Sequence, residues 1–303
     1  MTGTSWREQL AQLMGTAVKF DEPLSSYTTF RIGGPADALV TPNSLEQLAE
    51  ALRFSQGHNV PLTIIGNGSN LIVRDRGIRG IVIQVADNLN AINIDQETIS
   101  AQAGVRLIAL ARVAYDKGLS GLEFASGIPG TLGGAVAMNA GAYGGEMKDI
   151  VRSVTLMDLQ GQTRVIDAPD MHFGYRTSLA QGQSLLVVEA TMRLCPKDRA
   201  EIKATMDDLN ERRRTKQPLQ WPSAGSIFKR PPEHYAGPLI EGAGLKGVSV
   251  GGAQVSELHA GFIVNTGGAT ARDVLDLIHL VQDRVNEKYG VKLETEVRII
   301  GEE

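Results

Sequence analysis

Apolar positions recur along this chain at helical spacing in some segments and as short continuous runs in others. Leucines follow one another every three or four residues from position 45, after a capping box formed by Ser44 and Gln47, and predict a helix that ends near residue 57. The apolar stretch 36–40 predicts a strand before this helix. The run 61–65 predicts a buried strand after it. Together these elements predict a β-α-β unit with a right-handed crossover.

The rest of the chain continues this mixture of helices and strands. The pattern predicts helices after the Ser5/Glu8 capping box, over 107–117 and over 201–214, the last of them charged. It predicts strands over 80–85, 153–159, 185–194 and 291–300, with polar turns at Gly161 and Gly182. A last helix is capped by Thr270 and ended by Gly290, and its core face is Val274, Leu277, Ile278, Val281 and Val285. The elements do not alternate strictly, which favours an α+β fold in about three parts. We expect a first lobe over 1–86 with the terminal strand 291–303 returning near it, a second lobe over 87–208, and a third domain over 209–290.

Residues 127–144, GIPGTLGGAVAMNAGAYG, are rich in glycine and alanine. Pro129 and Gly130 predict a turn, after which Thr131 can cap a helix that runs on to Gly141. Glycines before a helix N-terminus leave N–H groups accessible to a phosphate. A helix that packs closely against a sheet would need the same small residues. The segment alone leaves both interpretations open.

A second glycine-rich turn, Gly66-Asn67-Gly68-Ser69-Asn70, follows the strand predicted at 61–65. It does not match a dinucleotide-binding GxGxxG motif, because Leu71 stands at the third glycine and the β-branched run after it favours a strand over a helix. The chain has no GxxxxGK[ST] motif. Backbone N–H groups of such a turn can form an anion-binding nest. The two glycine-rich elements therefore favour a dinucleotide bound by a different fold.

Composition narrows the class of protein. The chain has 303 residues, of which 42% are hydrophobic and 21% charged, enough for two or three domains. A net charge of −4 argues against a general nucleic-acid surface. The single cysteine, Cys195, excludes an intramolecular disulfide and predicts a packing role, and the five histidines lack metal-ligand spacing, so no metal is expected. With no signal peptide and no apolar run of membrane-spanning length, we expect a cytoplasmic protein without a membrane partner.

Six short motifs occur in an order that resembles one family of flavoenzymes. They are TTFRIGG at 28–34, GNGSN at 66–70, GIPGT at 127–131, YRTS at 175–178, GSIFK at 225–229 and LETEVR at 293–298. The first three resemble the FAD-binding fold shared with vanillyl-alcohol oxidase. All six together resemble the UDP-N-acetylenolpyruvoylglucosamine reductases of bacterial cell-wall synthesis, over about residues 28–301. The resemblance implies two FAD-binding lobes of the vanillyl-alcohol-oxidase/PCMH type and a C-terminal α/β substrate-binding domain.

The resemblance also implies a reaction and the residues that carry it. NADPH would reduce non-covalently bound FAD, whose hydride would then reduce the enolpyruvyl ether of UDP-N-acetylglucosamine to UDP-N-acetylmuramate, a peptidoglycan precursor. The family assigns Ser226 to proton donation and pairs Glu296 with Arg176, whose guanidinium suits the substrate carboxylate. The residues that the resemblance assigns to FAD are Arg31, Gly66, Asn67, Gly68, Ser69, Asn70, Gly127, Pro129, Gly130, Thr131, Gly133, Gly134, Asn139 and Gly141.

Three further residues are candidates for the sugar nucleotide on the same resemblance: Tyr175, Lys216 and Arg230, with Lys216 at the diphosphate. The chain resembles the subtype without an extra substrate-covering loop, so the tyrosine of that loop has no assigned counterpart here. These residues also have ordinary structural interpretations. The basic run 212–216 ends a helix, where cations complement the dipole, and Ser226 could be a plain turn residue.

Two other functions fit part of the sequence. An FAD oxidase that acts on an alcohol or a sugar would share the fold, but many such enzymes attach the flavin through a histidine in the glycine turn, and residues 66–70 contain neither histidine nor cysteine. A nucleotide-binding module without chemistry would explain the glycine loops but not Arg176, Ser226 and Glu296 together. The sequence does not set the oligomeric state, although a monomer is favoured.

Overall fold

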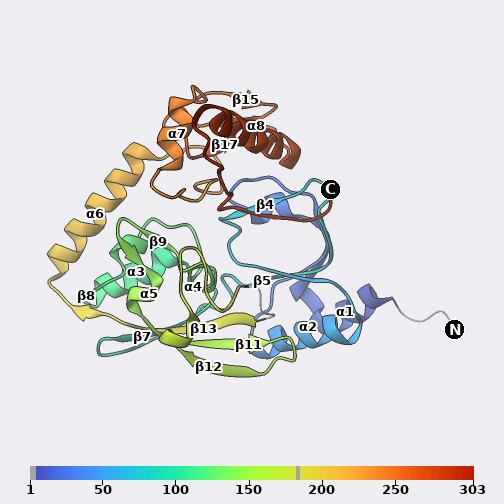
Figure 1. Cartoon of the computed structure of the whole chain (residues 1–303). Coiled ribbons are helices and arrows are strands. Elements are labelled where there is room, and N and C mark those ends of the chain that lie inside the picture. The colour runs from blue at the N-terminus through green and yellow to red at the C-terminus, as the bar shows by residue number, and fades with distance from the viewer. Residues whose placement is uncertain (1–4, 182–184) are drawn as a thin grey trace. The chain divides into compact units, whose positions relative to one another are not determined.

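The structure is a computed structural model that describes residues 5–181 and 185–303 (Figure 1). The chain divides into two compact units. The first comprises the residues up to Phe20, Ala38–Asn67 and Gly80–Arg212, and the second comprises Asp21–Asp37, Gly68–Arg79 and Arg213–Glu303. The predicted division at residue 209 stays a prediction. The further division of residues 1–208 into two lobes stays a prediction.

Helices and strands are mixed throughout, as an α+β fold requires. The helices are α1 (Trp6–Met14), α2 (Leu45–Gly57), α3 (Leu107–Asp116), α4 (Leu132–Ala137), α5 (Met147–Ile150), α6 (Arg199–Lys216), α7 (Ala236–Gly242) and α8 (Ala271–Tyr289). The strands are β1 (Val18–Pro23), β2 (Pro35–Val40), β3 (Leu62–Ile65), β4 (Leu71–Val73), β5 (Ile78–Gln84), β6 (Ile92–Asp95), β7 (Thr98–Gln102), β8 (Leu119–Ser120), β9 (Gly141–Ala142), β10 (Gly145–Glu146), β11 (Val151–Asp158), β12 (Thr163–Asp167), β13 (Leu185–Arg193), β14 (Cys195–Pro196), β15 (Ser249–Val250), β16 (Ala253–Val255), β17 (Ile263–Asn265) and β18 (Arg298–Ile300).

The predicted β-α-β segment is present near the N-terminus, but its two strands are not neighbours. The sheet order is β1-β2-β5-β3, so β5 lies between β2 and β3 and pairs with β3 in parallel. The Ser44 hydroxyl accepts a hydrogen bond from the Gln47 N–H at 3.2 Å and caps α2 as predicted. The return half of the capping box goes to Asn43 instead, whose N–H donates to the Gln47 side chain at 2.7 Å.

An antiparallel sheet of order β12-β11-β13-β7-β6 forms the second layer of the first unit. The strands predicted at 153–159 and 185–194 are confirmed as β11 and β13, and Gly161 makes the turn between β11 and β12 with a positive φ of 76°. The turn expected at Gly182 lies outside the described residues. Helix α4 packs on β13, and this contact places the glycine-rich segment against the sheet (Figure 1).

The core of the second unit forms between α8 and the small sheet β15-β16-β17 (Figure 1). Thr270 caps α8 with a complete capping box, and Gly290 ends it in the left-handed conformation, both as predicted. A second cap comes from far away in the sequence, because the Asp75 carboxylate accepts hydrogen bonds from the N–H groups of Ala271 at 2.8 Å and Arg272 at 3.0 Å. The predicted core face of α8 is buried throughout: Val274, Leu277, Ile278, Val281 and Val285.

The final strand is shorter than predicted. Only β18 pairs as a strand, in parallel with β4, with Arg298 beside Leu71. The preceding residues 291–297 do not join that ladder. Residues 294–297 bond to residues 227–229 instead, where Lys229 N–H donates to the Glu294 carbonyl and Glu296 N–H to the Ile227 carbonyl. The prediction of one long strand over 291–300 is therefore wrong, because hydrogen bonds to a different segment satisfy this backbone.

Cys195 is exposed in the short strand β14, so the packing role predicted for it is wrong. Among the described residues, no helix combines the length and the apolar character needed to cross a bilayer.

Candidate flavin and substrate site

The two glycine-rich segments meet within the first unit at Gly66. A Cβ on Gly66 would lie only 2.6 Å from Thr131 Oγ1, so this approach requires glycine. The Asn67 side chain donates from Nδ2 to the Pro129 carbonyl and joins the same two segments. The Asn67 backbone N–H donates to no group among the described residues. An accessible N–H in a glycine-rich turn is what an anion-binding nest offers.

Helix α4 is much shorter than predicted, and its N-terminus is largely used by the protein. It ends at Ala137, and the Thr131 side chain makes no capping hydrogen bond. The N–H of Leu132 donates to the Val105 carbonyl and that of Gly133 to the Ala103 carbonyl, both at 2.8 Å. The expectation of a helix that runs on to Gly141 is therefore wrong, and a contact of its N-terminus with the FAD phosphates stays a prediction.

The glycines of α4 differ in what surrounds them. A Cβ on Gly133 would lie 2.8 Å from the Ala103 Cβ, so this glycine serves close packing. Gly134 is exposed, and a Cβ there would meet only Thr131 Oγ1, at an ordinary 3.6 Å. Of the two positions, Gly134 is the one that leaves space for a ligand.

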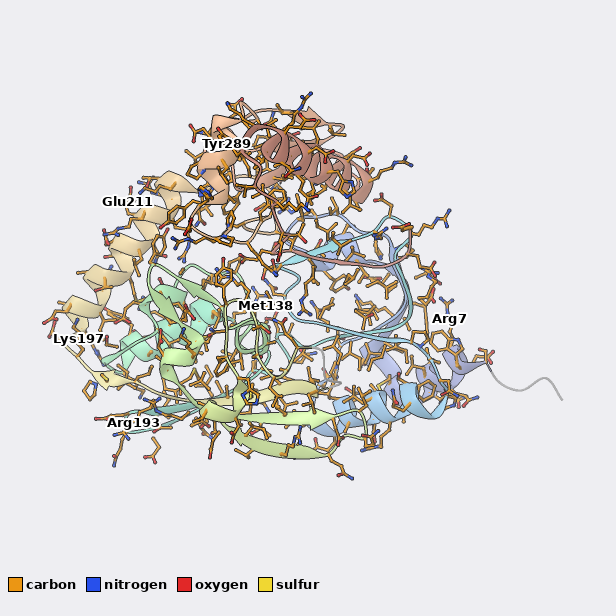
Figure 2. All side chains as sticks on the ribbon, in the orientation of Figure 1. Arg7, Met138, Arg193, Lys197, Glu211 and Tyr289 are labelled. Carbon is orange, nitrogen blue, oxygen red and sulfur yellow. The ribbon has the colours of Figure 1, made fainter. Side chains whose placement is uncertain are left out.

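Arg176 lies at the tip of a tight turn in the first unit. Gly174 and Thr177 bond to each other through both backbone groups, and Arg176 between them has a positive φ of 57°. Gln181 Nε2 donates to the Arg176 carbonyl at 3.0 Å and also to the sulfur of Met138, which is labelled in Figure 2. These bonds join the turn to the end of α4 and fix the backbone from which the guanidinium extends.

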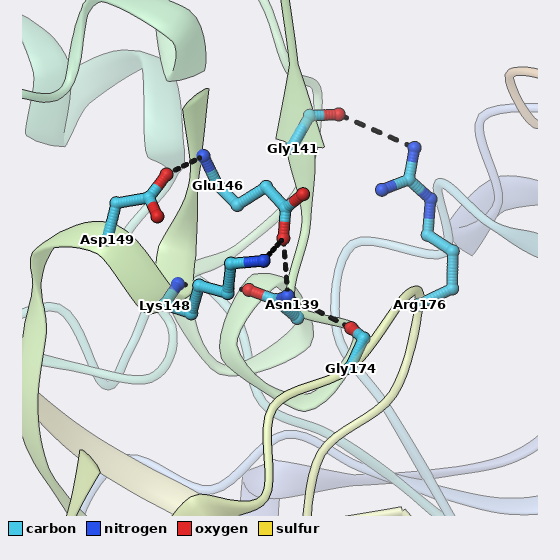
Figure 3. Close-up of polar contacts among 7 residues, drawn as sticks. All are labelled: Asn139, Gly141, Glu146, Lys148, Asp149, Gly174 and Arg176. Atoms are coloured by element: carbon cyan, nitrogen blue, oxygen red, sulfur yellow. Dashed lines mark hydrogen bonds and ion pairs between the residues drawn. The ribbon is translucent and has the colours of Figure 1, made fainter. Parts of the chain in front are cut away.

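Asn139 connects this turn to the β9–β10 hairpin, as Figure 3 shows. Its side chain is fully buried and donates from Nδ2 to the Gly174 carbonyl at 3.0 Å and to Glu146 Oε2 at 2.8 Å. Its Oδ1 accepts from the Lys148 N–H at 2.9 Å. The position assigned to FAD contact by resemblance is thus used here to build the support of Arg176.

Glu146 is a carboxylate that the sequence analysis missed. Partial burial raises its pKa, but hydrogen bonds from Lys148 and Asn139 and the charges of Lys148 and Arg176 outweigh burial and hold the pKa below its usual value. Lys148 Nζ lies 3.0 Å from its Oε2, and Arg176 reaches toward the Gly141 carbonyl at 3.5 Å, opposite Glu146 in the hairpin (Figure 3). The carboxylate therefore stays charged and adds a negative field beside the guanidinium.

In the second unit, Ser226 and Glu296 are brought together by the backbone of Ile227. The Ile227 N–H donates to the Gly261 carbonyl at 2.9 Å, and its own carbonyl accepts from the Glu296 N–H at 2.7 Å. Ser226 precedes Ile227 directly and pairs with Phe262 in an isolated bridge. Both Ser226 and Glu296 are half-buried, so their side chains remain accessible to a ligand.

Asn70 contributes to the same group of residues. Its Nδ2 donates to the Glu296 carbonyl at 3.2 Å, and its own carbonyl accepts from the Arg298 N–H at 3.0 Å. The resemblance assigns Asn70 to FAD, but the structure gives its side chain a second task, which is to hold the backbone of Glu296. Its neighbour Gly68 must be glycine, because a Cβ there would lie 2.1 Å from the Tyr27 carbonyl.

Four of the other candidates are exposed, namely Arg31, Tyr175, Lys216 and Arg230. Arg31 has a φ of 57° in a turn closed by its N–H to the Thr28 carbonyl. The Arg230 guanidinium lies 4.1 Å from the centre of the Tyr235 ring, and Arg176 lies 5.0 Å from the Tyr175 ring. Lys216 is in the last turn of α6. Tyr175 and Arg176 thus belong to the first unit, and Lys216, Ser226, Arg230 and Glu296 to the second.

The structure describes no group of histidine, cysteine or carboxylate side chains in residues 5–181 and 185–303 that could hold a metal ion. His259, like Glu146, was not among the predicted site residues; it lies on the loop 256–262 and belongs to none of the six motifs. The only local signal for Glu146 was its spacing to Asp149, with which it forms a capping box.

Comparison with known proteins identifies the class. Residues 36–167 match the family model described as an FAD binding domain, and residues 217–300 match that of the C-terminal domain of UDP-N-acetylenolpyruvoylglucosamine reductase. A moss protein, Physcomitrella patens BBE-like 1, shares the fold over 63% of this chain and 44% of its own, with a TM-score of 0.50 at 19% identity. The fold is therefore the FAD-binding fold of the vanillyl-alcohol-oxidase/PCMH type with an added C-terminal domain, as predicted, and the protein is an FAD-dependent oxidoreductase.

Relatives that match nearly the whole chain are more specific. UDP-N-acetylenolpyruvoylglucosamine reductases from Alkaliphilus oremlandii and Clostridioides difficile are 54% and 51% identical, each over 94% of both chains. The crystal structure of the Thermus caldophilus enzyme, UDP-N-acetylenolpyruvylglucosamine reductase, aligns with a TM-score of 0.79 at 39% identity, over 91% of this chain and 97% of the other. This chain belongs to the UDP-N-acetylenolpyruvoylglucosamine reductase family. These matches do not favour the oxidase or the non-catalytic alternative.

Proposed function

We propose that this chain uses NADPH and FAD to reduce UDP-N-acetylglucosamine enolpyruvate to UDP-N-acetylmuramate, and that Arg176, Ser226 and Glu296 carry the second half of the reaction. The observation that carries the proposal is the arrangement at Ile227, whose carbonyl accepts the Glu296 N–H and so holds the segment of Ser226 beside that of Glu296. A hydroxyl and a carboxyl on one rigid backbone unit suit proton transfer and charge stabilisation at a single substrate carbon.

The residues of the first unit fit a bound FAD. The unused N–H of Asn67, the bare Cα of Gly134 and the close approach of Gly66 to Thr131 suit an anionic, flat ligand that must come near the backbone. When bound, FAD would accept hydride from NADPH and supply it to the methylene carbon of the substrate. Neither histidine nor cysteine lies in residues 66–70, which agrees with non-covalent binding.

Arg176 is assigned to the substrate carboxylate. Hydride addition at the methylene carbon leaves negative charge on the neighbouring carbon and its carboxylate, and a guanidinium can stabilise that charge through two parallel hydrogen bonds. The turn that holds Arg176 is fixed by Gln181 and Asn139 before any ligand arrives. Such preorganisation means that little conformational entropy is lost when the carboxylate binds.

Ser226 is assigned to proton donation to the carbon next to the carboxylate. A serine hydroxyl is a weak acid, but an enolate-like carbanion is a strong base, so the transfer is feasible. Glu296 is assigned to stabilising this step beside Ser226. Tyr175, Lys216 and Arg230 are assigned to the sugar nucleotide. The exposure of all three and the positive charge of Lys216 and Arg230 support that role. Since both UDP-sugars and NADPH are cytoplasmic metabolites, we place the enzyme in the cytoplasm, where it meets neither nucleic acid nor membrane as a partner.

The two half-reactions separate these roles. We expect the Ser226→Ala variant to bleach the flavin absorbance with NADPH at a near-normal rate, because no proton is delivered to substrate in that half. Recovery of the absorbance after adding the enolpyruvyl substrate should slow by roughly 10²–10⁴-fold, the usual cost of losing a general acid. Stopped-flow absorbance follows both halves. The exposed Ser249 of the same unit, changed to alanine, is the matched control.

Glu296→Gln should show the same asymmetry, with slow recovery after normal bleaching. If Ser226→Ala slows both halves equally, its hydroxyl has a structural role and the proposed proton donor is wrong. If neither variant affects recovery while the control also behaves normally, the assignment of this half-reaction to the Ile227 region is wrong.

A further inference from the structure

A histidine lies behind the backbone that carries Ser226. His259 is half-buried, and its Nδ1 accepts a hydrogen bond from the Gly261 N–H at 3.1 Å. The carbonyl of the same Gly261 accepts the Ile227 N–H at 2.9 Å. The Ile227 carbonyl in turn accepts the Glu296 N–H at 2.7 Å. A continuous series of hydrogen bonds therefore runs from the imidazole through one glycine to the backbone of Ser226 and Glu296.

The loop that presents His259 is closed by its own hydrogen bonds. Ser256 Oγ accepts from the His259 N–H at 3.3 Å, the Phe262 N–H donates to the His259 carbonyl at 3.0 Å, and the Ser256 N–H donates to the Phe262 carbonyl at 2.9 Å. The edge of the imidazole meets the Phe262 ring, with centroids 5.0 Å apart at 71°. Phe262 is also the bridge partner of Ser226. Phe262 thus links the imidazole to the segment of the proposed proton donor.

The imidazole lies against the backbone of two glycines. A Cβ on Gly261 would lie 2.9 Å from His259 Cε1 and 3.1 Å from Nδ1, and one on Gly237 would lie 3.4 Å from Cε1. An acceptor at Nδ1 requires the neutral imidazole with its proton on Nε2.

We propose that His259 is a positioning residue for Ser226 and Glu296, and that it acts only as the neutral imidazole whose Nδ1 accepts the Gly261 N–H. A proton on Nδ1 would place two donors face to face. The peptide group between residues 260 and 261, which carries this N–H, would then have to move. Because Gly261 joins that peptide to the carbonyl that accepts the Ile227 N–H, the backbone next to Ser226 would shift with it. This inference rests on the proposed role of Ser226 in delivering a proton to substrate.

The surroundings of His259 favour the neutral form. Burial lowers its pKa below the usual value and is the largest cause, and the charge of Lys246 acts in the same direction. A hydrogen bond with its own backbone and the charge of Glu241 raise the pKa of His259, but by less than burial and Lys246 lower it. Lys246 and Glu241 form an ion pair at 2.7 Å, so their charges largely offset each other. The geometry should therefore persist at neutral pH and fail in acid.

Two substitutions distinguish the effect of the hydrogen-bond acceptor at His259 from that of its ring. His259→Asn keeps an acceptor that can reach the N–H two residues later, as in an Asx turn, but does not titrate. His259→Phe keeps a flat ring against Phe262 but has no acceptor. His279→Gln, on the exposed face of α8 in the same unit, controls for removing a histidine. Flavin content is measured for each variant, and both half-reactions are followed from about pH 5 to 8.

In the unsubstituted protein, recovery of the flavin absorbance by substrate should weaken as the pH falls below the ordinary histidine value of about 6.5, with one proton involved. The His259→Phe variant should recover about tenfold more slowly at every pH, which is the typical effect of one lost hydrogen bond. The His259→Asn variant should regain most of that rate and lose the acid dependence. Bleaching by NADPH should change little in any of them.

A direct readout is independent of turnover. Nitrogen NMR of the labelled imidazole should show an unprotonated Nδ1 at neutral pH and a midpoint of titration below about 6.5. The inference is overturned if Nδ1 carries the proton, or if His259→Asn keeps the acid dependence of the parent. It is also overturned if both half-reactions slow together in His259→Phe, since that is loss of general structure. Should His259→Phe not fold, the asparagine variant and the NMR titration decide.

The Ser226→Ala variant distinguishes the two proposals. Slow recovery in Ser226→Ala with normal recovery in His259→Phe would reject the positioning role alone. Normal recovery in Ser226→Ala would reject the proposed proton donor, and the His259 inference with it.

Discussion

The side chain of Asn70 donates a hydrogen bond to the carbonyl of Glu296 at 3.2 Å, across 226 positions of sequence. Because the Glu296 N–H is already bonded to Ile227, this peptide segment is held from both ends. Asn70 thus helps to fix the backbone position from which the Glu296 side chain extends. Asn70 can therefore act by supporting the Glu296 backbone, a role that differs from the direct contact with FAD that the resemblance assigns to it.

We expect Asn70→Ala to lower the free energy of unfolding by about 1 kcal/mol, the net value of one hydrogen bond. It should also slow recovery of the flavin absorbance by substrate, because the Glu296 backbone loses one support. Urea unfolding and stopped-flow absorbance measure the two effects, with the exposed Asn286→Ala on α8 as control. Loss of flavin with unchanged stability would instead assign the side chain to FAD alone.

Local signals in the sequence were sufficient for much of the fold. The extent of α8 followed from a capping box at Thr270, an apolar stripe and Gly290, all within one continuous segment. The cap from Asp75 was not predictable, because it depends on a contact 196 positions away. The same limit explains the final strand, where residues 291–297 alternate like a strand but residues 294–297 bond to residues 227–229.

In the candidate site, too, local signals were predictable and long-range contacts were not. The motifs indicated which residues matter, but not what each touches. Gly133 and Gly134 are indistinguishable in sequence, and only the position of Ala103 separates a packing glycine from an exposed one. Glu146 and His259 were missed because their roles depend on partners that no local spacing specifies. Asn139 was predicted to touch FAD, which stays a prediction, while its buried bonds to Gly174 and Glu146 are structural.

The difference between Gly133 and Gly134 predicts opposite outcomes for the same substitution. Gly134→Ala meets no close atom and should stabilise the flavin-free protein by up to about 1 kcal/mol, because alanine favours a helix. If FAD approaches this surface, the same change should weaken flavin binding. Gly133→Ala clashes with Ala103 and should destabilise the protein. Flavin titration and thermal unfolding distinguish them, and full flavin affinity in Gly134→Ala would remove Gly134 from the cofactor site.

The depressed pKa of Glu146 predicts a pH dependence of stability. A carboxylate whose pKa is lower in the folded than in the unfolded protein stabilises the fold above its ordinary value of 4.5, and this contribution is lost as the pH falls through the folded value. Glu146→Gln should therefore be less stable at pH 7, by under about 1 kcal/mol because the site is partly exposed. The gap should close in acid.

Urea unfolding of both proteins between about pH 7 and 3 measures this gap. The exposed Glu50 on α2, changed to glutamine, is the control. A gap that stays constant with pH would mean that shape and not charge sets the contribution of Glu146. A gap that shrinks in high salt would support the ionic interpretation.

Lys216 has two possible roles, a cation at the end of a helix or a contact with the substrate diphosphate, and they predict different losses of substrate affinity. It stands in the last turn of α6 with Arg213 and Arg214, where cations complement the helix dipole by a few tenths of a kcal/mol. A charge-assisted hydrogen bond to a diphosphate is worth about 1.5–3 kcal/mol. Lys216→Ala should therefore weaken substrate affinity on the order of tenfold or more, while flavin bleaching by NADPH stays close to normal. Lys203→Ala, an exposed lysine of the same helix paired with Asp207, controls for loss of one positive charge. Substrate titration measures the affinity of both variants and of the parent. If all three bind equally well and Lys216→Ala is slightly less stable, Lys216 is a helix-end cation and does not contact the diphosphate.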